Sequence, residues 1–206
     1  MGRGHGSSRG GGGASGAGRG GYSAGLTKAL SERETEIRTK GTERITAFDE
    51  NGNKLYENNK GFVGAVSLPK DIKSLENSVI THNHPEFKKG KRRSDEGGSF
   101  SSDDWNVMTL ANAKEMRAVT RNYTYSIKRP KSGWGVTTDF RDGIKRSWQS
   151  AWIPTERKIK VAREKYIANY KGDKEVARRR SFAVLYHQIN REAARQLGWE
   201  YSKTRN

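Results

Sequence analysis

The chain has 206 residues, of which 32% are hydrophobic, so it can form one domain with appendages or two small domains. Lys and Arg number 40 against 23 Asp and Glu, and the formal net charge of +17 suits a chain that meets nucleic acid or another polyanion. The absence of cysteine excludes disulfides, thiolate metal ligands and a cysteine nucleophile, so a metal would have to bind through histidine and carboxylate.

The N-terminal segment is mostly Gly, Ser, Ala and Arg, a composition that buries too little apolar surface to offset the entropy of ordering. We therefore predict a disordered tail over residues 1–25, followed by a short polar helix over 28–38. The segment 43–57, ERITAFDENGNKLYE, predicts strand, turn and strand, because its apolar residues flank the turn-forming ENGN. Segments 61–68 (GFVGAVSL) and 78–85 (SVITHNHP) predict two further strands, the second ending at a proline.

A helix is predicted from Ser101 along SSDDWNVMTLANAKEM, and the RAVTRNYTYSIKRP that follows predicts a strand or hairpin arm, because its apolar residues alternate. Residues 131–154 predict a loop with large packing anchors. These anchors are Trp134, Trp148 and Trp152. Two helices close the chain: one capped by Thr155, and one that begins at the cap Asp173 and stops at Gly198.

Together these elements predict an α/β fold, with helices flanking a mixed sheet over residues 28–150, and a basic helical extension over residues 151–206. This extension holds 14 basic and 6 acidic residues. Nucleic acid is therefore a candidate partner; a solvated basic surface is the alternative, because the cations form no single uninterrupted run. No apolar run approaches the about 18 residues that span a bilayer, so we expect no membrane partner and a cytoplasmic location. The sequence indicates no oligomeric state.

Two histidines lie one residue apart in a predicted strand. Side chains two apart on a strand project from the same face, so His82 and His84 can direct two imidazoles at one point while Asn83 turns away. A carboxylate would complete a two-histidine, one-acid metal site with a position open for water. The acids available downstream are Asp103 and Asp104, at the start of the next helix.

These acids also suit a helix N-terminus without any metal. Ser101 as cap with Asp104 three residues on is close to a capping box, and acids there interact favourably with the helix dipole. The two interpretations are compatible, because a serine can cap the helix while its acidic neighbour binds a metal.

The motif HNHP at 82–85, followed by SSDD at 101–104, resembles the H-x-H-P and S-x-x-D signature of the JAB/MPN (JAMM) metalloprotease superfamily. The amino-acid sequences of these two motifs are most similar to those of the RadC-like branch and of related domains in bacteriophage head and tail proteins. The resemblance spans about residues 43–128. It implies a cytidine-deaminase-like core with a mixed sheet flanked by helices.

The resemblance also implies a Zn²⁺ ion held by His82, His84 and Asp104. In this family the serine of the motif, here Ser101, helps to hold the oxyanion of the reaction. The implied reaction is hydrolysis of a peptide or isopeptide bond in a protein or peptide substrate.

The family further uses an upstream glutamate as acid and base at the edge of an early strand. Glu43 stands immediately before the predicted strand RITAFD and is our first choice for this role. Glu36 is the second choice, because its segment is predicted to be a helix or linker and not the edge of a strand. An exposed acid at a strand start is the alternative interpretation of Glu43.

One departure from the family pattern is the segment 86–100, which separates the two halves of the motif by fifteen residues, about twice the family gap. It contains KKGKRR, which would steer an acidic substrate, touch phosphates or keep a long loop solvated.

Three functions are compatible with these features. The first is a zinc-dependent hydrolase, phage-encoded and linked to particle assembly, located in the host cytoplasm or the virion. The alternative is a non-enzymatic, nucleic-acid-associated or virion structural protein that keeps the fold. A nuclease is the third, although a ββα-metal nuclease places its histidines farther apart along the chain.

Overall fold

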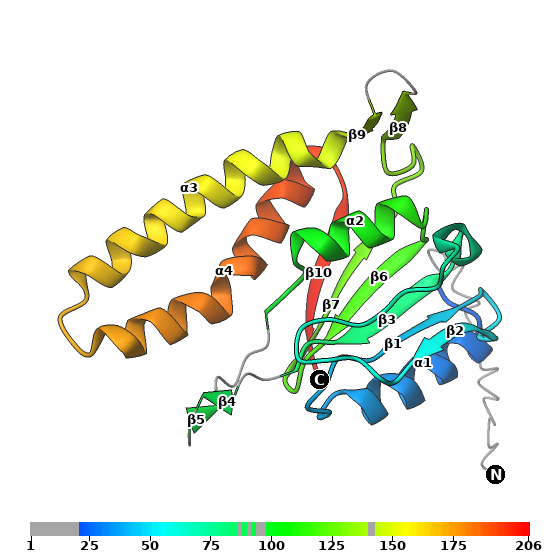
Figure 1. The fold of residues 1–206 in the computed structure, drawn as a ribbon, viewed down its shortest axis with the longest axis horizontal. Helices are drawn as coiled ribbons and strands as arrows, with labels where there is room; N and C mark the ends of the chain where they lie inside the picture. The colour runs from blue at the N-terminus through cyan, green and yellow to red at the C-terminus, as the bar shows by residue number, and fades with distance from the viewer. Residues whose placement is uncertain (1–20, 86–87, 90–91, 94–97, 140–142) are drawn as a thin grey trace, which may run out of the picture.

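The computed structural model describes residues 21–85, 88–89, 92–93, 98–139 and 143–206. Its middle is a six-stranded sheet (Figure 1) made of β1 (Ile45–Phe48), β2 (Lys54–Asn58), β3 (Val79–Asn83), β6 (Glu115–Val119), β7 (Tyr123–Lys128) and β10 (Glu200–Arg205). The order is β10-β7-β6-β3-β1-β2, with β3 and β6 parallel and the other neighbours antiparallel. The predicted α/β class with a mixed sheet and flanking helices is confirmed.

Two smaller sheets have two strands each. They are β4 (Lys88–Lys89) with β5 (Arg92–Arg93), and β8 (Val136–Asp139) with β9 (Gly143–Arg146). The second hairpin lies in the segment 131–154 that was predicted to be a loop. The other residues of the basic segment 86–97 lie outside the described part of the chain.

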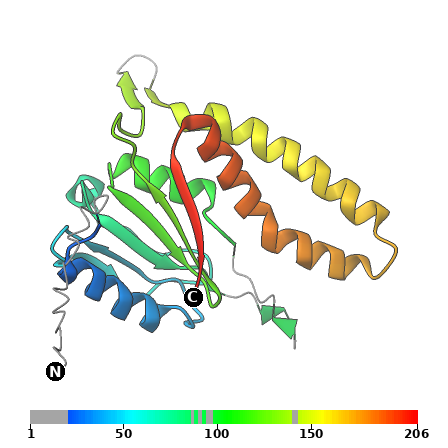
Figure 2. The same ribbon diagram turned by 180° about the vertical axis from the view of Figure 1, so that it is seen from behind.

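Helix α1 (Ala24–Ile37) covers one face of the sheet, along β1 and β3 (Figures 1 and 2). Its residues Leu26 and Leu30 pack against Phe48 and Val79 in a small apolar cluster. The side chain of Ser23 caps the helix by accepting a hydrogen bond of 3.1 Å from the Leu26 N–H. The helix therefore has both a cap and a buried face at its start.

This helix begins earlier than predicted. Residues 24–25 were assigned to the disordered tail and the helix to 28–38, but the cap and the burial of Leu26 stabilise a start at Ala24. Residues 1–20 of the predicted tail lie outside the described residues, and residues 21–23 precede the helix without regular secondary structure.

The other face of the sheet packs against α2 (Ser102–Leu110) and the C-terminal half of α4 (Lys174–Leu197). All five tryptophans of the chain meet in this core. The ring of Trp105 lies 5.0 Å from those of Trp152 and Trp199 and 5.6 Å from that of Trp148, measured between centroids. Trp134 contacts Trp199 edge to face at 4.7 Å. The three tryptophans predicted to be packing anchors are confirmed as buried.

Helices α3 (Ser147–Asn169) and α4 form a hairpin that projects away from the sheet (Figures 1 and 2). We call this hairpin the helical arm. The prediction that Thr155 caps the first helix is wrong: α3 begins at Ser147, and the burial of Trp148 and Trp152 holds its first turns in helical form. Asp173 and Gly198 do cap α4 as predicted, and Gly198 adopts the left-handed conformation with φ 69°.

The extension was predicted to be helical, but it does not remain helical to its end. Its last segment is β10, an edge strand that pairs with β7 through Tyr201 opposite Ile127 and Lys203 opposite Tyr125. Most of its residues are polar and exposed, so the sequence carries no apolar alternation that would predict it.

The predicted strand over 61–68 is also wrong. This segment forms a turn in which Phe62 and Ala65 make an isolated bridge, and Gly64 has a positive φ of 86°. A short 3₁₀ helix, η1 (Ile72–Leu75), follows it. Among the described residues, no helix is both long and apolar enough to cross a membrane.

Candidate metal centre

Strand β3 carries His82 and ends at Asn83, and His84 follows directly. Asn83, between the two histidines, turns to the opposite side, as predicted. The Asn83 amide is held away from the pair, because its Nδ2 donates to the carbonyls of Lys40 (3.3 Å) and Thr42 (3.1 Å) and its Oδ1 accepts from the Arg44 N–H at 2.8 Å. His82 is buried, with 1% of its surface exposed.

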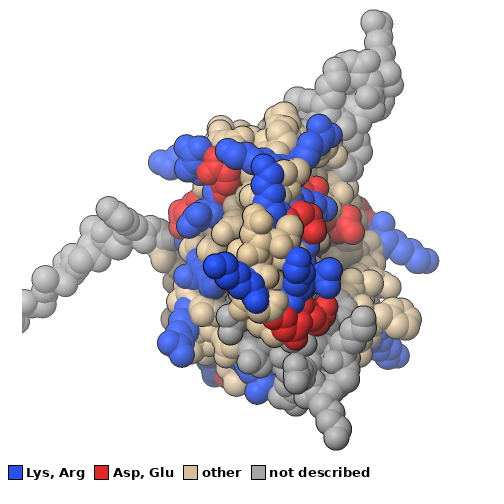
Figure 3. All heavy atoms as spheres, turned by 90° about the vertical axis from the view of Figure 1, so that its left-hand side faces the viewer, with Lys and Arg blue, Asp and Glu red and all other residues tan. Residues whose placement is uncertain are grey.

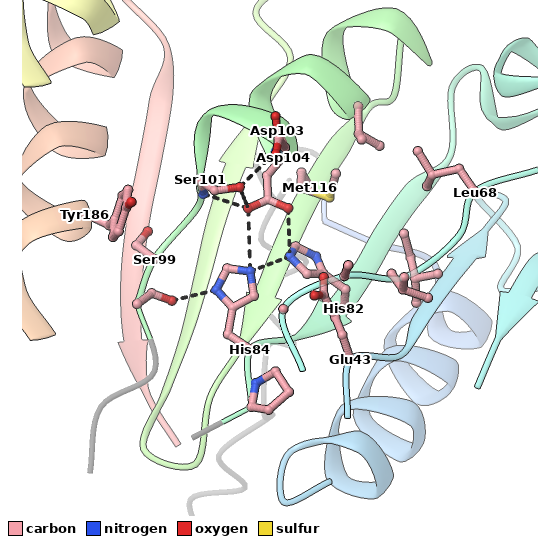
Figure 4. A pocket seen from close by; sticks show the side chains of 17 residues that line it. Glu43, Leu68, His82, His84, Ser99, Ser101, Asp103, Asp104, Met116 and Tyr186 are labelled. Carbon is pink, nitrogen blue, oxygen red and sulfur yellow. Dashed lines mark hydrogen bonds and ion pairs between the residues drawn. The ribbon is translucent and has the colours of Figure 1, made fainter. Parts of the chain in front are cut away.

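The two imidazoles face each other at their Nε2 atoms, which are 2.9 Å apart (Figure 4). On the far side of its ring, the Nδ1 of His84 lies 2.7 Å from the carbonyl oxygen of Gly98. Because a carbonyl only accepts hydrogen bonds, Nδ1 is the donor, and a neutral His84 presents the lone pair of Nε2 to its neighbours. This orientation is typical of a metal-binding histidine.

Asp104, in the first turn of α2, faces both rings. Its Oδ1 lies 3.1 Å from the His82 Nε2, and its Oδ2 lies 3.5 Å from the His84 Nε2. The predicted capping box is present as well: Oδ2 accepts hydrogen bonds from the Ser101 N–H at 2.6 Å and the Ser101 hydroxyl at 2.9 Å. Capping and metal binding can therefore be served by one carboxylate. Asp103, the other acid considered, is exposed.

Glu43 completes the cluster, immediately before β1. One potential ligand atom from each of Glu43, His82, His84 and Asp104 lies within 4.8 Å of the other three. The Glu43 backbone N–H donates a hydrogen bond of 2.8 Å to the Phe62 carbonyl, which fixes the residue at the edge of the sheet. Glu43 is 7% exposed, so the alternative of an exposed acid at a strand start is wrong.

Glu36, the second choice for the acid/base, lies elsewhere. It is on α1, where its carboxylate pairs with Arg33 at 2.7 Å and Arg44 at 3.3 Å. The hydrogen bond from Arg33 lowers its pKa. The structure thus brings Glu43 to the cluster and leaves Glu36 in a salt-bridge network.

Burial and mutual charge perturb the cluster strongly. Burial raises the pKa of Glu43. Burial alone would also raise the pKa of Asp104, but the charge of His82 and hydrogen bonds from both histidines hold it well below its usual value. For His84, burial acts to lower the pKa, and the hydrogen bond and charge of Asp104 outweigh it and raise the pKa to about 9. Shifts of this kind are typical of functional sites.

The donor set fits a zinc ion. Zinc bonds of about 2.0–2.1 Å in a tetrahedron separate neighbouring ligand atoms by about 3.3 Å. The separations between the two Nε2 atoms and from each to an Asp104 oxygen are 2.9, 3.1 and 3.5 Å, which bracket that value. Two imidazoles and one carboxylate are also the ligand types of open zinc sites.

A pocket of about 500 Å³ opens onto this cluster (Figure 4). Its polar side holds the four clustered residues together with Ser101. Its other side is apolar and includes Val66, Leu68, Val107 and Met116. A ligand with one polar and one apolar side would fit this division.

The segment 98–105, which carries half of the site, is fastened by the C-terminal elements. The Tyr201 hydroxyl of β10 lies 2.8 Å from the Ser99 hydroxyl and 2.8 Å from the Nδ1 of His187 on α4. The buried Asn190 of α4 donates a hydrogen bond of 2.8 Å to the Phe100 carbonyl. It also accepts one of 2.5 Å from the Trp105 indole.

Sequence reasoning did not find these supporting residues. Gly98, Asn190 and Tyr201 lie far from the histidines in the chain and belong to no local motif. His187, which contacts the Tyr201 hydroxyl, belongs to this supporting set as well.

Comparison with known proteins gave no relative from which a role could be transferred. No family model, no curated protein and no solved structure matches this chain. The function therefore has to be argued from the site itself.

Proposed function

We propose that this chain is a zinc-dependent hydrolase of the JAB/MPN type that cleaves a peptide or isopeptide bond. The observation that carries the proposal is the convergence of Glu43, His82, His84 and Asp104 at the head of one pocket. His82, His84 and Asp104 would hold the ion. A zinc ion bound there lowers the pKa of a coordinated water and polarises a carbonyl group.

Glu43 is suited to move the proton. Its burial raises the pKa of the carboxyl, which makes the group a better proton acceptor. It lies on the pocket lining, beside the three residues that would hold the ion, and it takes no part in an ion pair among the described residues. We assign it to accept a proton from the attacking water and to return it to the leaving amine.

Ser101 is suited to stabilise the oxyanion. Its hydroxyl lines the pocket and donates to Asp104 Oδ2 at 2.9 Å. A hydroxyl has one proton, so donating to a substrate oxygen requires release of the carboxylate. The Ser101 backbone N–H, at 2.6 Å, continues to hold Asp104 when that happens. A positioned donor of this kind contributes about 3–4 kcal/mol to the transition state.

The biological setting follows from the motif resemblance alone. We place the hydrolase in a phage genome, with a role in particle assembly, because domains of phage head and tail proteins, together with the RadC-like branch, are the ones that the HNHP and SSDD motifs resemble most.

Two variants test the proposal. Zinc content of the purified chain should be about one equivalent, and His84→Ala should lose it because a ligand is removed. Glu43→Gln should keep the zinc and lose cleavage of a peptide library by a factor of about 100 or more, because only the proton acceptor is lost.

The pair separates metal binding from catalysis. A native chain that binds no zinc, or a Glu43→Gln variant that cleaves as fast as the native chain, would overturn the proposal.

A further inference from the structure

The helical arm carries an excess of positive charge. Between residues 153 and 184 the sequence has ten Lys and Arg and four Asp and Glu. The arm projects from the sheet, and on the face of the molecule seen from the arm's side, Lys and Arg outnumber Asp and Glu (Figure 3).

The acids of the arm offset only part of this charge, because three of them each pair with a single cation. Glu156 pairs with Lys160 at 2.8 Å, Glu164 with Arg163 at 3.0 Å, and Glu175 with Arg178 at 3.7 Å. The fourth acid, at position 173, is the cap of α4.

One of these cations also fastens the arm. Arg163 donates hydrogen bonds from α3 to the Ser181 hydroxyl at 3.1 Å and to the Arg178 carbonyl at 3.4 Å on α4. With the buried Ile167 and Ala177, these contacts hold the two helices together. The remaining cations are therefore presented by a fixed scaffold.

Three of these remaining cations share one face of α3. Arg157, Lys158 and Lys165 are exposed, and at about 100° per residue they fall within about 100° of arc around Val161. No carboxylate among the described residues is within ion-pair distance of these three side chains. Val161 itself is 51% exposed, so nothing in the described chain covers this face.

The spacing of these charges suits a phosphate backbone. Arg157 and Lys165 are eight residues apart, or about 12 Å along the helix axis. Duplex DNA presents one phosphate charge per about 1.7 Å of its axis, so about seven charges lie along that length. Like charges at this density destabilise an isolated helix, and a polyanion that neutralises them stabilises it.

We propose that this face of α3, centred on Arg157, Lys158 and Lys165, binds the phosphate backbone of duplex nucleic acid. The contact is electrostatic and independent of base sequence, because side chains that bind phosphates carry no base information. The proposal does not depend on the metal centre or on the proposed hydrolase activity.

The test compares two triple variants of the full chain in binding to a labelled DNA duplex of arbitrary sequence. The arm variant replaces Arg157, Lys158 and Lys165 with alanine. The matched control replaces Lys28, Lys60 and Lys70, three exposed lysines on α1 and around β2, with alanine. Both variants lose three charges from exposed positions, so both are expected to fold, which circular dichroism verifies.

Fluorescence anisotropy between about 50 and 200 mM salt gives the slope of log affinity against log salt concentration. Loss of three phosphate contacts should reduce this slope by about 3 and weaken binding on the order of 100-fold at about 0.1 M salt. The control variant should have the affinity of the native chain and a salt slope that differs from the native slope by no more than about 1, the effect of one phosphate contact.

Three results would overturn the proposal. If the native chain does not bind the duplex, the proposal is wrong. Equal losses in the two variants would show diffuse attraction by the whole basic surface. Binding to phosphatidylserine vesicles, with no binding to the duplex, would assign the face to a membrane instead.

Discussion

Removal of the Asn190 side chain should both destabilise the fold and weaken metal binding. Asn190→Ala leaves the Phe100 carbonyl and the Trp105 indole N–H without their partner. Both residues are fully buried, and an unsatisfied buried polar group costs about 1–3 kcal/mol. We therefore expect the free energy of unfolding to fall by about 2–6 kcal/mol, and the melting temperature by about 8–16 °C for a central loss of about 4 kcal/mol.

The consequence for the site follows from the position of Phe100. Its carbonyl precedes Ser101, whose N–H and hydroxyl hold Asp104, so a loosened segment displaces a metal ligand. Loss of supporting contacts of this kind weakens metal binding about 10- to 100-fold. Urea denaturation and zinc competition with a chelator measure the two effects.

Gln188→Ala is the matched control for this prediction. Gln188 is exposed on the same helix, and its truncation should change unfolding by less than about 0.5 kcal/mol. If Asn190→Ala costs less than about 1 kcal/mol, water or another group satisfies the two polar atoms and the reasoning is wrong.

Two further predictions concern the pH dependence of the site and its packing. Because the pKa of His84 is about 9 without an ion, a proton occupies the ring at neutral pH and must leave before zinc binds. Zinc affinity should therefore rise about tenfold per pH unit as the pH increases from about 6 to 8. Competition with a chelator measures this affinity, and an affinity that does not change with pH would contradict the prediction. Gly61→Ala places a Cβ 2.1 Å from the Glu43 carbonyl oxygen, so it should lower the free energy of unfolding by about 1–3 kcal/mol in urea titrations. Gly41→Ala is the control, because no atom lies within 4 Å of its Cβ, and equal losses in the two variants would refute the packing argument.

The central part of the site could be predicted because its signals are local. Extended backbone at the end of β3 and into the residue that follows it sets the common direction of His82 and His84. The cap of α2 fixes Ser101 and Asp104 within one turn. Both rules depend on residues a few positions apart. The convergence of the two motifs required the parallel pairing of β3 with β6, which no local pattern in the sequence indicates.

The parts that could not be predicted depend on contacts between distant segments. Asn190 reaches Phe100 and Trp105 across about ninety residues, and no periodicity marks it. β10 is missed because hydrogen bonds to β7, rather than apolar side chains, hold it in the sheet. The turn at 61–68 looks like a strand by composition, but Gly61 lies too close to the Glu43 carbonyl to carry a side chain.

The double use of the Asp104 carboxylate would couple a metal ion bound at this site to the backbone of α2. One oxygen closes the first helical turn through Ser101, and the other is directed at His82. Withdrawal of such an ion would leave the carboxylate with more freedom to rotate, and the helical turn that it closes would then fray more often. Occupancy of the centre and order at the beginning of this helix are thus linked in a single equilibrium, so amide exchange in that turn would report whether the ion is present.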